Sequence, residues 1–135
     1  MKTLLFSLAL LMVGATAKNC NSSKKTAAHL TAGCYKGKLV VKAACMNYTI
    51  AVTEGNMDTT LVNASWTDEQ TGKAYSNVFA LGSRCSFPPE IKEGDEFYFK
   101  LDSTTVQNCA VCMIYYPVPS RHLSIKVLNE PCTTD

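Results

Sequence analysis

Two cysteines three residues apart, Cys109 and Cys112, have the Cys-x-x-Cys spacing that carries chemistry in many proteins. Such a pair can be a thiol redox centre, half of a zinc site, or two ends of separate structural disulfides. A redox pair normally lies at the N-terminus of a helix, whose dipole lowers the pKa of the thiol. Here the pair is followed by MIYYPVP, which predicts a strand ending at Pro117. A structural role is therefore favoured.

Other catalytic or metal-binding patterns are missing from the sequence. A zinc site would need a second close cysteine pair or histidines at ligand spacing, and neither His29 nor His122 has that spacing. No nucleophile elbow or glycine-rich phosphate loop occurs, and the acidic pairs Asp68-Glu69 and Asp95-Glu96 are expected in solubilising turns. We therefore predict a binding protein without catalytic residues, metal or cofactor rather than an enzyme.

The N-terminal sequence MKTLLFSLALLMVGATA has the three parts of a secretory signal peptide. Lys2 supplies the basic start, an apolar run extends from Leu4 to Val13, and the small residues Ala15 and Ala17 precede a cleavage point. The apolar run is too short to cross a bilayer, and no later segment approaches the necessary length. We expect residues 1–17 to be removed and residues 18–135 to form one soluble, secreted domain.

Seven cysteines follow the signal peptide, and export to an oxidising compartment makes a disulfide framework the default. Three bridges would use six of them and leave one as a buried thiol, a modified residue or the cross-link of a disulfide-linked dimer. Three sequons, beginning at Asn21, Asn47 and Asn63, are candidate glycosylation sites and agree with export. The cysteines are Cys20, Cys34, Cys45, Cys85, Cys109, Cys112 and Cys132.

Alternation of apolar and polar residues after Cys34 predicts a series of short strands separated by turns. This pattern favours an all-β antiparallel barrel or sandwich. A short helix is expected over Asn21–Gly33, capped by Ser22 or Ser23. The expected strands are Lys38–Ala44, Tyr48–Thr53, Thr59–Trp66, Ala74–Leu81, Phe97–Leu101, Ala110–Tyr116 and Leu123–Leu128. The expected core side chains are Leu39, Val41, Ile50, Val52, Leu61, Trp66, Val78, Phe97, Phe99, Ile114, Leu123, Ile125 and Val127.

Three segments resemble the netrin-like module, as in the N-terminal domain of tissue inhibitors of metalloproteinases. GCYKGKLVVKAA is similar to that family's cysteine followed at once by a long first strand. RCSFPPEIKEGDEFYFKL is similar to its middle cysteine, glycine-containing turn and aromatic strand, and CAVCMIYYPVPSRHLSIKVLNEPC to its last cysteine pair. The order and rough spacing agree from about Cys20 to Cys132. The resemblance implies a small closed, OB-like antiparallel barrel of five to six strands with one short N-terminal helix packed on it.

The resemblance also implies a disulfide pattern. Inhibitors of that family open with Cys-x-Cys, whereas this chain has Cys20 alone, which makes Cys45 the substitute partner. One cysteine of the Cys-x-x-Cys pair would then be unpaired. The implied bridges are Cys20–Cys85, Cys34–Cys132, and Cys45 with either Cys109 or Cys112.

The family's inhibitory site implies an interaction ridge built from the N-terminal cysteine segment and a facing loop. In those inhibitors the cysteine is the first residue, and its α-amine and carbonyl oxygen chelate the zinc of the protease. Cleavage after Ala17 leaves Lys18 and Asn19 ahead of Cys20, so the α-amine cannot chelate in the same geometry. A metalloproteinase is therefore a hypothetical extracellular partner with a specific objection against it. The expected ridge consists of Cys20, Asn21, Ser22, Gly82, Ser83, Arg84 and Cys85.

Two other functions remain open. A small-lipid carrier or immune-type ligand on a β-sandwich would line a cavity with MIYYPVP and FYFKL, although ordinary core packing accounts for both segments. A thiol oxidoreductase would use Cys109 and Cys112. Neither nucleic acid nor an anionic membrane surface is an expected partner, because the net charge is only +2 and the charges are interspersed.

Overall fold

The computed structural model describes residues 33–104 and 108–132. The signal peptide and the Cys20–Ser22 part of the expected ridge lie outside the described residues, as does the expected helix except for Gly33. Regular structure in the described part consists of strands and two short 3-10 helices, η1 (Ala44–Met46) and η2 (Arg84–Ser86). The strands are β1 (Cys34–Lys42), β2 (Tyr48–Glu54), β3 (Asn63–Thr67), β4 (Ala74–Leu81), β5 (Glu96–Leu101), β6 (His122–Leu123) and β7 (Ile125–Leu128).

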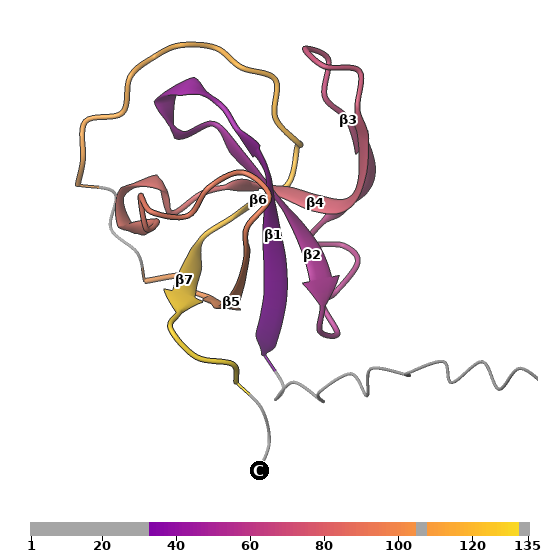
Figure 1. Ribbon diagram of the computed structural model, residues 1–135, viewed down its shortest axis with the longest axis vertical. Coiled ribbons are helices and arrows are strands. Elements are labelled where there is room, and N and C mark those ends of the chain that lie inside the picture. The colour runs from indigo at the N-terminus through magenta and orange to yellow at the C-terminus, as the bar shows by residue number, and fades with distance from the viewer. Residues whose placement is uncertain (1–32, 105–107, 133–135) are drawn as a thin grey trace, which may run out of the picture.

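The strands form one mostly antiparallel sheet in the order β3-β4-β2-β1-β5-β7 (Figure 1). The predicted all-β, disulfide-stapled fold is confirmed, but the sheet is not closed and a barrel is not supported. The last segment of the sheet is divided at Ser124: the two residues of β6 pair in parallel with β4, and the four residues of β7 pair antiparallel with β5. No continuous strand therefore joins β4 on one side of the sheet to β5 on the other.

Strand β1 lies in the middle of the sheet and shows the expected alternation. Tyr35, Gly37, Leu39 and Val41 are buried, and the residues between them are partly exposed. On the outer face Lys36 forms ion pairs with Glu54 and Glu96 at 3.3 and 2.8 Å. A side chain at Gly37 would place its Cβ 2.9 Å from the ring of Phe99, so only glycine fits the close approach of that ring.

Aromatic side chains fill the core. The ring of Phe99 is fully buried and lies 5.5 Å from that of Tyr35, 5.8 Å from that of Phe79 and 6.1 Å from that of Phe97, measured between centroids. The segment FYFKL therefore supplies packed core rather than the wall of a cavity. Leu101, expected on the same side as Phe97 and Phe99, is 41% exposed.

The predicted strand over Ala110–Tyr116 is wrong. Residues 108–119 form no helix or strand, and Ile114, expected in the core, is 61% exposed. Cys109 and Cys112 are bonded to two different parts of the fold, which holds this segment away from the edge of the sheet. The prediction followed from the apolar and aromatic composition of the segment, but the side chains of Met113, Ile114 and Tyr115 face solvent.

We expect Phe99→Ala to lower the free energy of unfolding by about 3–5 kcal/mol, because it leaves a cavity among three other aromatic rings. Leu101→Ala is the matched control on the same strand, and its partly exposed side chain should cost less than about 1 kcal/mol. Urea unfolding monitored by circular dichroism measures both. Equal losses would contradict the packing described here.

Candidate functional site

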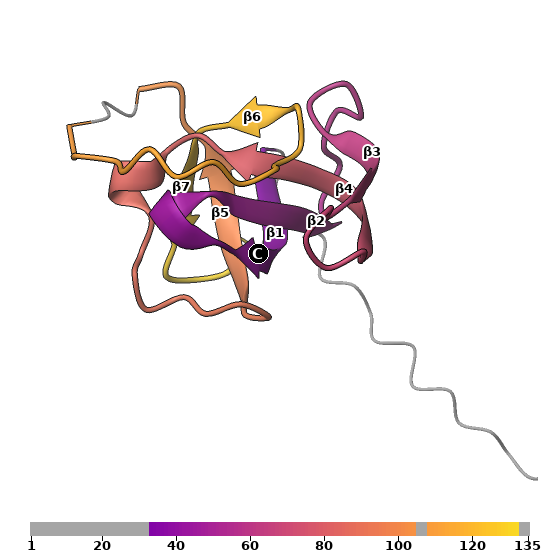
Figure 2. The same ribbon diagram turned by 90° about the horizontal axis from the view of Figure 1, so that it is seen from above.

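The most unusual surface feature is the segment Asn108–Val118, which we call the stapled loop. It forms the orange arc in Figure 1 that passes around η1, and Figure 2 shows it running beside β1 and β2 before the chain reaches β6. Two disulfides fix its first half: Cys109 is bonded to Cys85 and Cys112 to Cys45, with Cα atoms 5.5 and 5.1 Å apart. The structural role predicted for the Cys-x-x-Cys pair is confirmed.

The bridges agree with the implied pattern in two of three cases. Cys34–Cys132 forms as implied by the family resemblance, and Cys45 is the partner of Cys112. The implied bridge from Cys20 to Cys85 is wrong, because Cys85 is bonded to Cys109. The prediction that one member of the Cys-x-x-Cys pair is unpaired is wrong for the same reason. The six described cysteines bond to one another, and Cys20 lies outside the described residues.

The bridges stabilise the molecule chiefly by restricting the unfolded chain. They connect cysteines separated by 98, 67 and 24 residues, and the chain-entropy model assigns each about 3–5 kcal/mol. Two of the three end on the stapled loop. The molecule therefore uses a large part of its covalent cross-linking to fix one surface segment.

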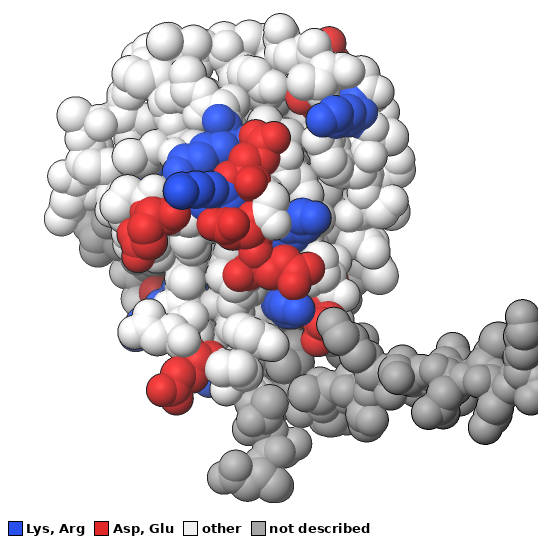
Figure 3. Space-filling view, viewed as in Figure 1, with Lys and Arg blue, Asp and Glu red and all other residues white. Residues whose placement is uncertain are grey.

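The tip of the stapled loop exposes three large apolar side chains in succession. Met113 is 97% exposed, Ile114 61% and Tyr115 85%. No charged residue occurs between Asn108 and Ser120, and the upper-left part of the face in Figure 3, where the loop lies, shows neither acidic nor basic side chains. Contiguous exposed apolar surface on a folded extracellular domain commonly marks an interaction site.

Two polar side chains position the tip from below. The side-chain amide of Asn47 donates hydrogen bonds to the carbonyl oxygens of Ala44 and Ile114, at 2.9 and 3.0 Å. The hydroxyl of Tyr116 donates to both carboxylate oxygens of Asp68, at 3.2 and 3.1 Å. The tip is thus held at its start by the Cys112 bridge, in its middle by Asn47 and at its end by Tyr116.

Asp68 is not the solubilising turn residue that its local sequence predicts. The residue is fully buried and also accepts hydrogen bonds from the backbone N–H of Gln70 at 3.0 Å and the hydroxyl of Thr71 at 2.7 Å. Burial acts to raise the pKa of Asp68, but the hydrogen bonds from Thr71, Gln70 and Tyr116 outweigh it, so the pKa lies below its ordinary value. The carboxylate therefore stabilises the fold above the ordinary pKa, and this contribution is lost as the pH falls through the lowered value.

The described half of the expected ridge, Gly82–Cys85, is a packed corner. Ser83 is fully buried; its hydroxyl donates to the carbonyl of Ile125 and accepts from the N–H of the same residue, both at 2.9 Å. A Cβ at Gly82 would lie 2.9 Å from the hydroxyl oxygen of Ser124. This loop therefore holds β6 and β7 in place, and Ser83 is not available to a partner.

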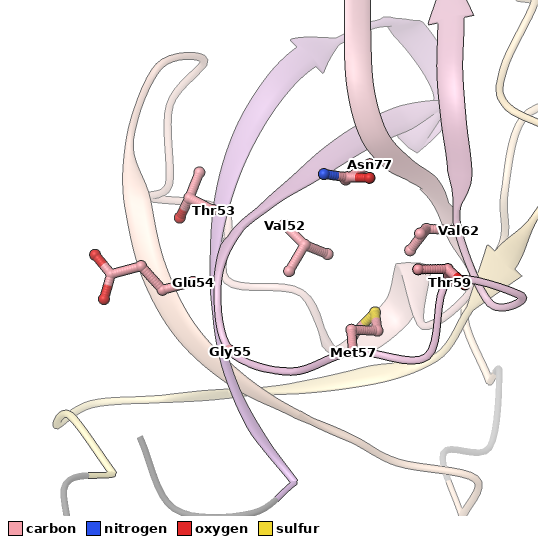
Figure 4. Close-up of a pocket in the computed structure, with 8 residues that line it drawn as sticks. All are labelled: Val52, Thr53, Glu54, Gly55, Met57, Thr59, Val62 and Asn77. Atoms are coloured by element: carbon pink, nitrogen blue, oxygen red, sulfur yellow. The ribbon is translucent and has the colours of Figure 1, made fainter. Parts of the chain in front are cut away.

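Four cavities near the described strands have volumes between about 180 and 380 Å³. Figure 4 shows a pocket of about 180 Å³ beside Gly55, with Val52, Met57 and Val62 turned inward and Glu54 turned away. Its volume is below the range usual for small-molecule sites. A second cavity of about 320 Å³ lies under the end of the stapled loop, between Tyr116, Tyr75 and Lys73.

Comparisons with protein-family models, curated proteins and solved structures find no match to this chain. Within residues 33–104 and 108–132, no group of three or more histidine, cysteine or acidic side chains could hold a metal ion. No helix in the described part of the chain is long and apolar enough to cross a membrane.

Replacement of Tyr116 by phenylalanine tests the anchor of the loop. We expect it to lower the free energy of unfolding by about 1–2 kcal/mol, because Asp68 loses one donor. Tyr115→Phe is the matched control, since the Tyr115 side chain is 85% exposed, and should change stability by less than about 0.5 kcal/mol. Chemical unfolding of both variants provides the measurement, and an equal effect would argue against the anchor.

The sequon at Asn47 should be empty in the folded protein. A glycan would replace one amide hydrogen, yet both carbonyls that Asn47 reaches lie close around it, the residue is 8% exposed, and the sequon threonine, Thr49, is fully buried. Glycopeptide mapping of the protein produced in a eukaryotic secretory system reports the occupancy. A glycan on Asn47 in molecules that retain the Cys45–Cys112 bridge would contradict this geometry.

Proposed function

We propose that this chain is an exported binding protein that recognises another extracellular protein through the stapled loop. The observation that carries the proposal is the tip itself, where Met113, Ile114 and Tyr115 are exposed and uncharged on a backbone fixed by two disulfides. A fixed loop loses little conformational entropy on binding, so most of its apolar contact area contributes to affinity. Protein–protein interfaces are enriched in aromatic residues and methionine for the same reason.

The same proposal includes that the chain is exported and that its domain is of the netrin-like kind. The signal-peptide pattern and the three disulfides both fit an oxidising compartment. The Cys34–Cys132 bridge agrees with the pattern that the resemblance implies.

The alternatives have less support. Zinc chelation by an N-terminal cysteine needs that cysteine tethered beside the Cys85 loop, but Cys85 is bonded to Cys109. A lipid carrier would need FYFKL and MIYYPVP around a cavity, whereas Phe97 and Phe99 pack in the core and Met113 faces solvent. A dithiol oxidoreductase would need Cys109 and Cys112 bonded to each other, and they have different partners.

Photo-cross-linking from the stapled loop tests the proposal. A photoreactive methionine analogue at Met113 in the exported protein should cross-link to a defined extracellular protein, and Tyr115→Asp should abolish the product because it places a charge in the apolar contact. Leu101→Asp, at an exposed apolar position on β5, is the matched control and should leave the product unchanged. Cross-linking that is absent, or that ignores Tyr115→Asp, would reject the loop as the binding surface.

A further inference from the structure

Resting on the proposed binding function, we propose that the stapled loop occupies the substrate cleft of an endopeptidase and inhibits it. The endopeptidase is one whose specificity pocket accepts a large uncharged side chain. Met113 is the residue that enters this pocket, because it is the most exposed of the three tip residues at 97%. Three features of the loop select this partner over other proteins: its main chain outside the sheet, its bracing and its lack of charge.

The main chain of the loop lies outside the sheet, and two side chains contact it: Cys85 Sγ accepts from the N–H of Cys109 at 3.1 Å, and Asn47 donates to the carbonyl of Ile114 at 3.0 Å. Residues 108–119 belong to no strand or helix, and within the described residues no backbone–backbone hydrogen bond of the turns and loops involves them. Endopeptidase clefts bind an extended chain by main-chain hydrogen bonds and read single side chains with pockets, as do other sites that recognise extended peptides. A convex loop whose main chain lies outside the sheet and whose successive side chains at Met113, Ile114 and Tyr115 are exposed has the matching form.

The bracing distinguishes an inhibitor from a substrate. The bridge of Cys112 to Cys45 lies directly before Met113, Asn47 holds the carbonyl of Ile114, and the Tyr116–Asp68 hydrogen bonds hold the chain beyond Tyr115. A loop fixed on both sides cannot relax into the geometry of hydrolysis as a flexible peptide does. Fixing it before binding also removes most of the ordering cost of association.

The absence of charge defines the pocket. Residues 108–120 carry no acidic or basic side chain, so a pocket with a buried carboxylate, such as that of trypsin, would be left with an unpaired charge. A hydrophobic pocket of the chymotrypsin type accepts methionine without this penalty. The same uncharged tip could enter a lipid interface, but that mode makes no use of the clamp by Asn47 or of a single dominant side chain.

The experiment is an inhibition assay with the full exported protein and short chromogenic peptides. Endopeptidases of serine, cysteine and metallo type that prefer large apolar residues form the panel, and trypsin is included. We expect competitive inhibition of at least one panel enzyme at micromolar concentration. Met113→Gly should raise its inhibition constant by roughly 30-fold or more, as for a hot-spot residue. Met113→Lys should abolish that inhibition and create inhibition of trypsin.

Leu101→Lys is the control for added charge, because Leu101 is also exposed but lies on β5; it should behave as the wild type in both assays. Failure to inhibit any panel enzyme would overturn the proposal, as would rapid cleavage after Met113 or an inhibitory potency that Met113→Gly leaves unchanged. Loop-dependent cross-linking without inhibition would retain the proposed binding function and reject the endopeptidase. Binding to phosphatidylcholine vesicles that is lost in Met113→Gly, with no enzyme inhibited, would assign the tip to a lipid surface instead.

Discussion

Two disulfides that start three residues apart determine the most distinctive part of this molecule. A strand residue and the third one after it face opposite sides of the chain, so bonds from Cys109 and Cys112 pull on both sides of one segment. Their partners lie in the two 3-10 helices, Cys85 in η2 and Cys45 in η1. With both bonds formed, the segment lies outside the sheet. The side chains of Met113, Ile114 and Tyr115 are consequently left in solvent.

The sheet serves as the rigid base for this loop. Its core is dominated by buried aromatic rings around Phe99. Because Gly37 has no side chain, the ring of Phe99 can approach β1 closely. The corner at Gly82–Cys85 is locked by the Ser83 hydroxyl, which exchanges two hydrogen bonds with Ile125. One end of the Cys85–Cys109 bridge is thereby attached to a well-packed position. The tip is therefore preorganised by the packed sheet and the Gly82–Cys85 corner, to which its bridge is attached, and not by the loop's own sequence.

The polar contacts beneath the tip show how buried hydrogen bonds add specificity to covalent bracing. Asn47 and Asp68 come from different turns, and both contact the loop. The side-chain amide of Asn47 donates to the main-chain carbonyl of Ile114, and the carboxylate of Asp68 accepts from the hydroxyl of Tyr116. A disulfide fixes the distance between the two cysteines that it joins, but it leaves the orientation of the residues that follow them free. The amide of Asn47 fixes the Ile114 carbonyl, and this sets which side chains face outward. The low exposure of both anchors strengthens these bonds, because they compete with little water.

Most of the short strands, the β class, the aromatic core residues Phe97 and Phe99, and the use of the cysteines in disulfides could be predicted from the sequence, because they follow from two-residue periodicity and composition. The sequence did not determine that Ala110–Tyr116 leaves the sheet, since an apolar, aromatic segment has the same pattern whether it is buried or exposed. Nor did it show that Asp68 is buried, because turn residues are usually solvated. The pairing of Cys85 with Cys109 rather than Cys20, and the open sheet, were decided by tertiary structure alone. Bridge partners and strand neighbours depend on distances between residues far apart in the chain, and no local pattern encodes those distances.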